Sequence, residues 1–331
     1  MPRKVRVTEV VRETADAVSL VLDASGGGDF AYRPGQFLTL RIPGGQARCY
    51  SLASSPHTGE PLRITVKKVA GGRGSGWVCD EVTAGDELEV LPPAGTFTPD
   101  DLDADVLLVA GGSGITPVIS IAKSVLAAGR GRVALLYANR DQDAVIFRDE
   151  LWGLAERYPG RLALVHWLET LQGLPTAELL TSALAPYADR TAYLCGPAPL
   201  MDAAERALRA VGVRSVHRER YFSLAADVFE APAGAEAVAE GSRTAEVRLD
   251  GRTRQVPWGP DTPLLDALLA AGVDAPYSCR EGACSACCCR VVTGEVKMLR
   301  NEVLDEEDLA EGYVLACQAL PLTERVEVTY D

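Results

Sequence analysis

Four cysteines near the C-terminus constrain this chain more than any other feature. Cys279, Cys284 and Cys287 follow the spacing Cys-x4-Cys-x2-Cys, and Cys317 follows after a long gap. Four thiolates with this spacing are typical ligands of a [2Fe–2S] cluster, in which three of the ligands converge from one tight loop. Such a cluster passes one electron at a time, so the rest of the chain is expected to supply electrons.

The residues around these cysteines favour a cluster over the alternatives. Small residues between them allow backbone N–H groups to approach the sulfurs. Cys317 lies in the apolar run 313–320, which predicts a strand beneath the loop. Zinc is the alternative, but structural zinc sites usually pair two Cys-x2-Cys units and only one is present here. Cys288 and Cys289 are predicted to be buried structural thiols, with Cys289 as an alternative ligand.

Length, charge and hydropathy exclude several classes of protein. A chain of 331 residues is long enough for two or three domains. A net charge of −13 argues against a nucleic-acid partner, because phosphate binding needs a basic face. We find no apolar run long enough for membrane insertion and no signal-peptide core near the N-terminus. Together with the clustered cysteines, this predicts a reducing, cytoplasmic location.

The hydrophobic pattern changes along the chain and predicts separate domains. Residues 1–103 contain short alternating stretches between Gly/Pro-rich turns, a pattern typical of a small antiparallel barrel. Residues 104–225 contain continuous apolar runs alternating with helical patterns, which predicts a parallel α/β domain. Residues 226–242 are predicted to be a linker, and 243–331 form a third domain that carries the cysteines.

Two short segments in the first domain are candidates for binding a phosphorylated, aromatic cofactor. The segment Arg48-Cys-Tyr-Ser51 offers a cation, an aromatic plane and a hydroxyl, although alone it is a weak motif. The segment Gly71-Gly-Arg-Gly-Ser-Gly-Trp77 offers a glycine loop that opens a helix and can cradle an anion. By itself, that loop is equally compatible with a hairpin tip.

Two further segments belong to the second domain. Gly111-Gly-Ser-Gly-Ile-Thr-Pro117 follows the first buried strand and opens a helix, but Pro117 replaces the third glycine of the usual dinucleotide fingerprint. Cys195-Gly-Pro197 ends a later strand. In this order, the motifs resemble the ferredoxin-NADP reductase superfamily, and the cysteine segment with Leu315-Ala-Cys-Gln318 resembles plant-type ferredoxin domains.

These resemblances imply a multi-domain fold. The expected domains are an FAD-binding antiparallel β-barrel over 1–103, an NAD(P)-binding α/β domain with a parallel sheet over 104–225, and a β-grasp (α+β) [2Fe–2S] ferredoxin domain over 243–331. The metal ligands would be Cys279, Cys284, Cys287 and Cys317.

The superfamily resemblance also implies residue roles. Tyr50 would stack on the isoalloxazine, Ser51 would hydrogen-bond near flavin N5, and Arg48 would pair with the FAD pyrophosphate. Glu219 is a hypothetical proton donor or tuning group near the flavin, and Tyr221 would cover the other flavin face, where the family usually has Phe. The catalytic residues would be Ser51, Cys195, Glu219 and Tyr221. The remaining cofactor-binding residues would be Leu52, Lys67, Gly74 and Ser75 for FAD, and Gly111, Gly112, Gly114, Thr116, Asn139, Arg140, Cys195, Gly196 and Pro197 for the nicotinamide nucleotide.

Cys195 also invites interpretation as a catalytic nucleophile. No histidine lies nearby in the sequence to activate it, and the family uses this position to contact nicotinamide. We therefore expect Cys195 to serve in cofactor contact rather than in thiolate chemistry.

The domain order is that of electron-transfer components of multicomponent oxygenases. The stretches 136–141, 145–147, 166–175 and 301–318 resemble the reductases of 3-ketosteroid 9α-hydroxylases. The implied enzyme is an NADH-dependent flavin and iron–sulfur oxidoreductase of steroid metabolism. It would pass electrons from NADH through FAD and the cluster to a terminal oxygenase, expected to be a Rieske-type 3-ketosteroid 9α-hydroxylase. Alternatives are a phenylacetyl-CoA epoxidase reductase, a free-standing flavin reductase, and a zinc module on a nucleotide-binding sensor.

Three finer expectations complete the sequence interpretation. Asn139-Arg140-Asp141 supplies one cation and a neighbouring acid, so NADH is favoured and NADPH remains possible. A monomer is expected. The acidic stretch between Glu302 and Glu311 is either a solvated helix face or a docking surface for a basic partner.

Overall fold

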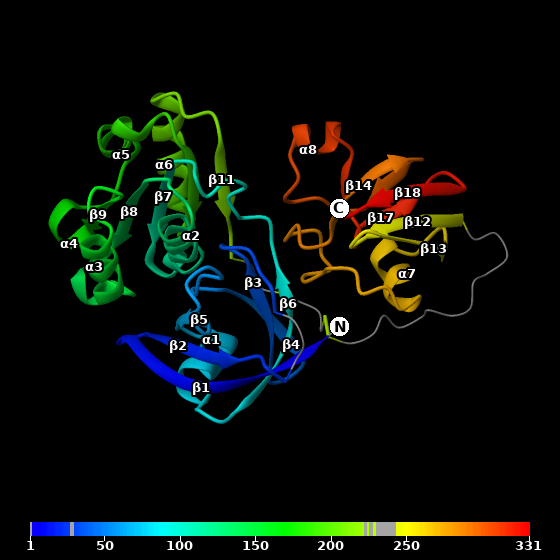
Figure 1. The fold of residues 1–331 in the computed structure, drawn as a ribbon, viewed down its shortest axis with the longest axis horizontal. Coiled ribbons are helices and arrows are strands. Elements are labelled where there is room, and N and C mark those ends of the chain that lie inside the picture. The colour runs from blue at the N-terminus through cyan, green and yellow to red at the C-terminus, as the bar shows by residue number, and fades with distance from the viewer. Residues whose placement is uncertain (1, 27–29, 222–223, 225–227, 230–242) are drawn as a thin grey trace.

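The computed structural model describes residues 2–331 except 27–29, 222–223, 225–227 and 230–242. Figure 1 shows three lobes, each built around its own sheet: the N-terminal lobe in blue, the central lobe in green and the C-terminal lobe in yellow to red. The expected linker at 226–242 lies outside the described residues, apart from Val228 and Phe229. Among the described residues, no helix is long and apolar enough to cross a lipid bilayer.

The N-terminal lobe is an antiparallel six-stranded sheet in the order β4-β3-β6-β1-β2-β5. A bridge between Leu52 and Ile64 joins the end of β4 to β5 and closes the sheet into a barrel. The barrel interior is filled by fully buried aliphatic side chains such as Leu20, Leu38 and Leu40. Its elements are β1 (Arg3–Thr14), β2 (Ala17–Asp23), β3 (Phe37–Ile42), β4 (Gln46–Ser51), β5 (Leu62–Lys67), α1 (Arg73–Asp80) and β6 (Glu87–Ala94).

The central lobe is a parallel five-stranded sheet in the order β11-β10-β7-β8-β9, with helices on both faces. Helices α2 and α3 cover one face, and α5 and α6 cover the other. Strands buried on both faces explain the continuous apolar runs of the sequence. The elements are β7 (Val106–Gly111), α2 (Ile115–Ala128), β8 (Val133–Asn139), α3 (Arg148–Arg157), β9 (Leu162–Leu168), α4 (Glu169–Gln172), α5 (Ala177–Leu184), β10 (Thr191–Cys195), α6 (Ala198–Ala210) and β11 (Val216–Glu219).

The C-terminal lobe is a mixed five-stranded sheet in the order β13-β12-β18-β14-β16, crossed by one helix. Strands β12 and β18 pair in parallel at its centre, and the fully buried Trp258 and Leu268 join the sheet to helix α7. This is the expected β-grasp arrangement. Its elements are β12 (Arg243–Leu249), β13 (Arg252–Trp258), α7 (Leu264–Ala270), β14 (Cys288–Thr293), β15 (Val296–Met298), α8 (Glu306–Ala310), β16 (Tyr313–Leu315), β17 (Ala319–Pro321) and β18 (Arg325–Thr329).

Cys317 corrects one expectation from the sequence. The apolar run 313–320 predicted one strand, but Cys317 lies in the turn between β16 and β17. The backbone N–H of Cys317 points at the Cys287 sulfur (3.4 Å), and that of Gln318 donates to the carbonyl of Leu315 (2.8 Å). The chain therefore turns beside the Cys287 sulfur between β16 and β17. The residues of this turn are buried, so the run 313–320 is apolar although it is not one continuous strand.

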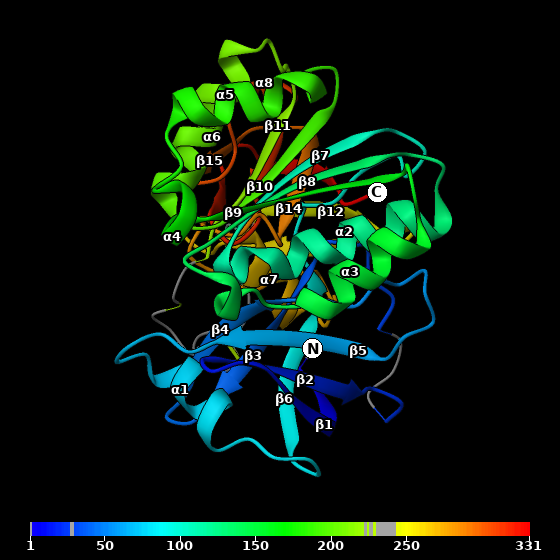
Figure 2. The ribbon, with the colours of Figure 1, turned by 90° about the vertical axis from the view of Figure 1, so that its left-hand side faces the viewer.

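The barrel contacts both other lobes. Figure 2 shows helices α2 and α3 of the central lobe above barrel strand β5. On another side, barrel residues Phe37, Ala47 and Leu91 join the buried apolar cluster of the C-terminal lobe. Strand β3 is consequently buried on both faces.

Candidate functional site

A cleft of about 270 Å³ opens between the barrel and the central lobe. It brings together residues from β4, β5, the start of α1, and the segments that follow strands β7 and β11. Most of the residues expected from the sequence to bind FAD meet here. The lining residues are Arg48, Cys49, Tyr50, Ser51, Thr65, Val66, Lys67, Val69, Gly72, Arg73, Gly74, Ser75, Ser113, Thr116 and Tyr221.

The glycine loop forms a helix start at one end of this cleft. Helix α1 begins at Arg73, and within the described residues no side chain caps its N-terminus at Gly72. Free N–H groups at a helix start attract anions such as a pyrophosphate. A Cβ atom on Gly74 would lie 3.0 Å from Cγ of Arg48, so glycine allows the helix to approach that cation. The loop is therefore a helix start and not a hairpin tip.

Two aromatic side chains from different lobes line the same cleft. Tyr50 lies on β4, and burial raises the pKa of its phenol. The Tyr221 hydroxyl lies 2.9 Å from Oγ1 of Thr116 and donates to the carbonyl of Ser113 at 3.0 Å. Tyr221 as a whole remains 46% exposed. A cleft with an aromatic ring from each lobe and an anion cradle fits FAD.

The turns that follow β7 and β10 touch each other at the carboxyl end of the sheet. Strands β7 and β10 are adjacent and parallel, and Ala110 pairs with Cys195. A Cβ atom on Gly114 would lie 2.0 Å from the carbonyl oxygen of Cys195, and one on Gly111 would lie 2.8 Å from Cδ of Pro197. Strand order reverses beside β7, and ligands of open α/β sheets bind at such a point.

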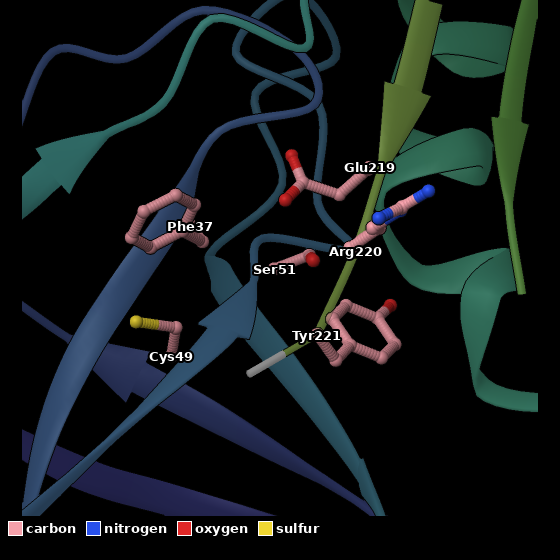
Figure 3. Close-up of a pocket in the computed structure, with 6 residues that line it drawn as sticks. All are labelled: Phe37, Cys49, Ser51, Glu219, Arg220 and Tyr221. Atoms are coloured by element: carbon pink, nitrogen blue, oxygen red, sulfur yellow. The ribbon is translucent and has the colours of Figure 1, made fainter. Parts of the chain in front are cut away.

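A small space of about 10 Å³ lies between the barrel and the end of β11 with the residues that follow it (Figure 3). Desolvation raises the pKa of the Glu219 carboxyl to about 8, so this carboxyl is protonated at neutral pH. Burial likewise raises the pKa of the Cys195 thiol, which argues against thiolate chemistry. The lining residues are Phe37, Cys49, Ser51, Glu219, Arg220 and Tyr221.

The four expected metal ligands converge in the C-terminal lobe. The Cys279 sulfur accepts hydrogen bonds from the backbone N–H groups of Glu281 (3.3 Å) and Ala283 (3.4 Å). Hydrogen bonds with the Cys284 and Cys317 thiols, followed by those backbone donors, lower the pKa of the Cys279 thiol. Four buried thiols with backbone donors aimed at sulfur fit an iron–sulfur cluster.

Iron–sulfur clusters and zinc ions use four cysteines in different ways. A [2Fe–2S] cluster divides its protein ligands between two irons, whereas structural zinc needs four ligands on one ion. Cys288 and Cys289 begin strand β14. Cys289 is buried as predicted, whereas Cys288 is only half-buried, and desolvation raises the pKa of both thiols.

Some expected site residues lie outside the cleft. Leu52 is fully buried in the barrel, where its bridge to β5 closes the sheet. Asn139 ends β8 and is 8% exposed, with both side-chain amide atoms buried and unpartnered within the described structure. Arg140 follows it and pairs with Asp141 at 2.9 Å. These two residues lie at the edge expected to receive the adenosine half of the nucleotide.

Several cleft residues were not expected from the sequence. Gly72 and Arg73 are the N-cap and the first residue of α1. The glycine loop that predicts this helix start therefore also identifies both residues. Cys49 stands between two motif residues, where the pattern accepts any side chain. Phe37 and Arg220 line the small space beside the cleft and carry no local signal, because only the approach of the two lobes brings them together.

Comparisons with known proteins define the class. The "Oxidoreductase FAD-binding domain" family matches residues 4–98, the "Oxidoreductase NAD-binding domain" family matches 108–206, and the "2Fe-2S iron-sulfur cluster binding domain" family matches 247–322. The protein is therefore an FAD- and NAD-binding oxidoreductase with a C-terminal iron–sulfur domain.

Similar proteins narrow the class further. The chain is 51% identical to the "3-ketosteroid-9-alpha-monooxygenase, ferredoxin reductase component" of Rhodococcus rhodochrous over 335 residues, which covers 98% of this chain and 95% of the relative. It is 37% identical to a component of the 1,2-phenylacetyl-CoA epoxidase of Escherichia coli, over 98% of this chain and 96% of that protein. The chain belongs to the family of oxygenase reductases that includes these ferredoxin reductase components.

Solved structures share the three-domain architecture. Phthalate dioxygenase reductase is 25% identical with a TM-score of 0.57, over 98% of this chain and 97% of that one. Full-length CYP116B46 from Tepidiphilus thermophilus is 27% identical with a TM-score of 0.66, and this chain spans 42% of its length.

Proposed function

We propose that this protein is the NADH-dependent reductase component of a multicomponent oxygenase, of the 3-ketosteroid 9α-hydroxylase type. The observation that carries the proposal is the contact between the candidate flavin cleft and the cysteine loop. The hydroxyl of Ser278, next to Cys279, lies 3.3 Å from the sulfur of the cleft residue Cys49 and also hydrogen-bonds barrel residue Thr39 at 2.7 Å. Similarity of 51% over nearly the whole chain supports the steroid type over the epoxidase type at 37%.

The barrel residues would bind and orient FAD. Arg48 and the start of α1, with Gly74 and Ser75, would hold the pyrophosphate, and Lys67 would add a second cation at the cleft wall. Tyr50 and Tyr221 would enclose the ring system, with Ser51 donating a hydrogen bond to it. When bound, a flavin accepts a hydride from a reduced nicotinamide and releases its electrons one at a time.

The turns after β7 and β10 would hold the nicotinamide nucleotide. Because Gly111, Gly114 and Gly196 let these turns touch, the turns form one continuous backbone surface beside Thr116 and Tyr221. Gly112 and Pro197 would complete that surface. The Glu219 carboxyl, protonated below about pH 8, would keep negative charge away from the ring and supply a proton there.

The four cysteines would bind the cluster, and the backbone donors to Cys279 would favour its reduced, more negative state.

Cys284→Ser provides the main test. We expect NADH to bleach the flavin in this variant, while NADH-dependent reduction of cytochrome c and hydroxylation of a 3-ketosteroid by the terminal oxygenase are both lost. A free-standing flavin reductase would instead retain full activity with every acceptor. Supplying the epoxidase oxygenase in place of the steroid oxygenase distinguishes the two partner types by the product formed.

NADH is the expected electron donor. Arg140 is the cation closest in sequence to the end of β8, and Asp141 neutralises it at 2.9 Å. The same carboxylate caps the following turn by accepting from the N–H of Ala144. In Asp141→Asn, Arg140 becomes available to a 2′-phosphate, and a charge-assisted bond is worth a roughly tenfold gain in kcat/KM for NADPH. Arg140→Gln in the same background removes that gain, and no gain in Asp141→Asn would contradict the assignment.

The domain limits 1–103, 104–225 and 243–331, the monomeric state and the cytoplasmic location complete the proposal. The strands of the three sheets support these limits, since they end at Ala94, Glu219 and Thr329. Size-exclusion chromatography with light scattering tests the monomer, and cell fractionation tests the location.

A further inference from the structure

Cys49 lies between the candidate flavin cleft and the cysteine loop. It sits on β4 between Arg48 and Tyr50, and it lines both the cleft and the small space beside it. Figure 3 shows Cys49 with Phe37 on the barrel side of that space, opposite the segment that follows β11. Cys49 pairs directly with Thr39 of β3, so both side chains project from the barrel face that the C-terminal lobe covers.

Ser278 completes a continuous contact across the two lobes. Its hydroxyl lies 3.3 Å from the Cys49 sulfur and 2.7 Å from Oγ1 of Thr39, and Thr39 lies 3.7 Å from the same sulfur. Ser278 is 1% exposed and immediately precedes the predicted ligand Cys279. A single side-chain hydrogen bond therefore separates the cleft wall from the backbone of the cluster loop.

A second hydrogen bond joins the same two lobes but lies away from the candidate flavin cleft. Oγ1 of Thr96 lies 2.9 Å from Oγ of Ser285, which adjoins Cys284, but Thr96 lines neither the cleft nor the small space. This contact holds the lobes together without touching the flavin site. It provides a matched control for a role in docking alone.

We propose that Cys49 and Ser278 form the junction through which electrons cross from the flavin cleft to the cluster loop. The inference depends on the FAD and cluster sites assigned under the proposed function. Electron tunnelling decays faster across empty space than along covalent and hydrogen bonds. The Cys49–Ser278 contact therefore couples the two sites more strongly than a gap of the same length without bonded atoms. In each transfer one electron leaves the reduced flavin and enters the oxidised cluster, while no covalent bond forms or breaks and the thiol is not oxidised.

The chemistry of Cys49 suits this role. Burial raises the pKa of its thiol to about 12, so the sulfur stays protonated and keeps a hydrogen bond with Ser278. Sulfur is also more polarizable than the oxygen or carbon atoms that neighbouring side chains offer. A neutral, hydrogen-bonded thiol therefore couples the two sites without adding charge between them.

The test measures the rate of cluster reduction relative to flavin reduction in the holoprotein. Stopped-flow absorbance after mixing with NADH gives both rates in one sample, and an equilibrium redox titration gives both potentials. We expect Cys49→Ala and Ser278→Ala to lower the ratio several-fold with unchanged potentials. Cys49→Ser, which keeps a hydrogen-bonding atom, recovers part of the loss. The double alanine variant should be no slower than the slower single variant, because both changes break one contact.

Thr96→Val is the control and should leave the ratio unchanged. Three results would overturn the proposed junction. The ratio of cluster reduction to flavin reduction could fall equally in Thr96→Val, or it could stay unchanged in both alanine variants. Shifted flavin or cluster potentials could also account for the whole fall in the ratio. If an alanine variant folds poorly, Cys49→Val keeps the buried volume and gives the same measurement. Failure of the proposed function has a different result, since wild-type protein would then lack flavin or iron–sulfur absorbance, or NADH would not bleach the flavin.

Discussion

Glu219 and Cys195 lie at the carboxyl ends of neighbouring strands, and burial changes the acid–base chemistry of both. The pairing of β10 with β11 sets Cys195 beside Glu219. Desolvation raises the pKa of each group, so that both are neutral at pH 7. At the residue scale, burial therefore moves the pKa of Glu219, but not that of Cys195, into a pH range in which the activity of the protein can be measured.

Glu219→Gln tests the carboxyl. The ordinary Glu pKa is 4.5, and the folded protein raises it to about 8. The unfolded chain therefore loses this proton first, and wild-type stability falls relative to the variant as pH rises from 4.5 to about 8. We expect flavin reduction by NADH to decline above about pH 8 in wild type, and the variant to lack this decline. Identical pH–rate and pH–stability profiles for the two proteins would show that Glu219 has no role at the flavin.

The turns after β7 and β10, which make up the proposed nicotinamide surface, touch only because glycine occupies their contact. Ala110 and Cys195 pair in register, which fixes the distance between the two strand ends. No other side chain fits at Gly114, since its Cβ would meet backbone atoms of the neighbouring turn. At the element scale, backbone packing between the two turns therefore requires glycine at this contact, independently of any phosphate that the turns would bind.

Gly114→Ala should force the two turns apart. The added Cβ would stand 2.0 Å from the Cys195 carbonyl oxygen, and overpacking of this kind costs about 1–3 kcal/mol. We expect a lower melting temperature and a higher KM for NADH. Gly153→Ala is the matched control, because Gly153 lies within α3 with open space around it and should gain about 0.4–1 kcal/mol. If Gly114→Ala matches this control, the close contact does not exist in solution.

A cluster of ion pairs around the buried Lys123 joins the barrel to the central lobe. Lys123 of α2 is 4% exposed and binds Glu60 of the barrel at 2.7 Å and Glu150 of α3 at 3.0 Å. Glu150 also binds barrel residue Arg63 at 2.7 Å. Burial opposes ionisation of Glu60, but Lys123 outweighs that effect and lowers the pKa of this carboxyl. At the scale of the whole molecule, these ion pairs join the barrel to helices α2 and α3, and α2 follows directly from the turn after β7.

Lys123→Met should weaken that interface. Removing one partner leaves Glu60 without its nearest cation, at a cost of about 3 kcal/mol for a largely buried pair. We expect a lower melting temperature and slower flavin reduction by NADH, because the lobes lose their fixed orientation. Adding Glu60→Gln should restore much of the stability. A double variant that is less stable than Lys123→Met by the full cost of Glu60→Gln alone would show that the two residues do not interact.

Local patterns predicted the fold and the cofactor classes well. Continuous apolar runs predicted the parallel sheet, alternation predicted the barrel, and cysteine spacing predicted the iron–sulfur domain, all of which the comparisons confirm. The run around Cys317 was wrong as a strand, because burial under a turn and burial in a sheet give the same apolar sequence. The roles of the individual cofactor-binding residues remain predictions, and two of these residues, Leu52 and Arg140, lie outside the cleft.

The sequence by itself determined which cofactor domains are present and in what order, because cysteine spacing, glycine turns and strand periods are local properties of the chain. Only the tertiary structure decided which groups from different domains meet. Cys49 and Ser278 are 229 residues apart, and neither carries a local signal for the other. The same holds for Lys123 with Glu60 and for Tyr221 with Thr116. Such contacts follow from the packing of whole faces, which depends on the sum of many buried side chains rather than on any motif.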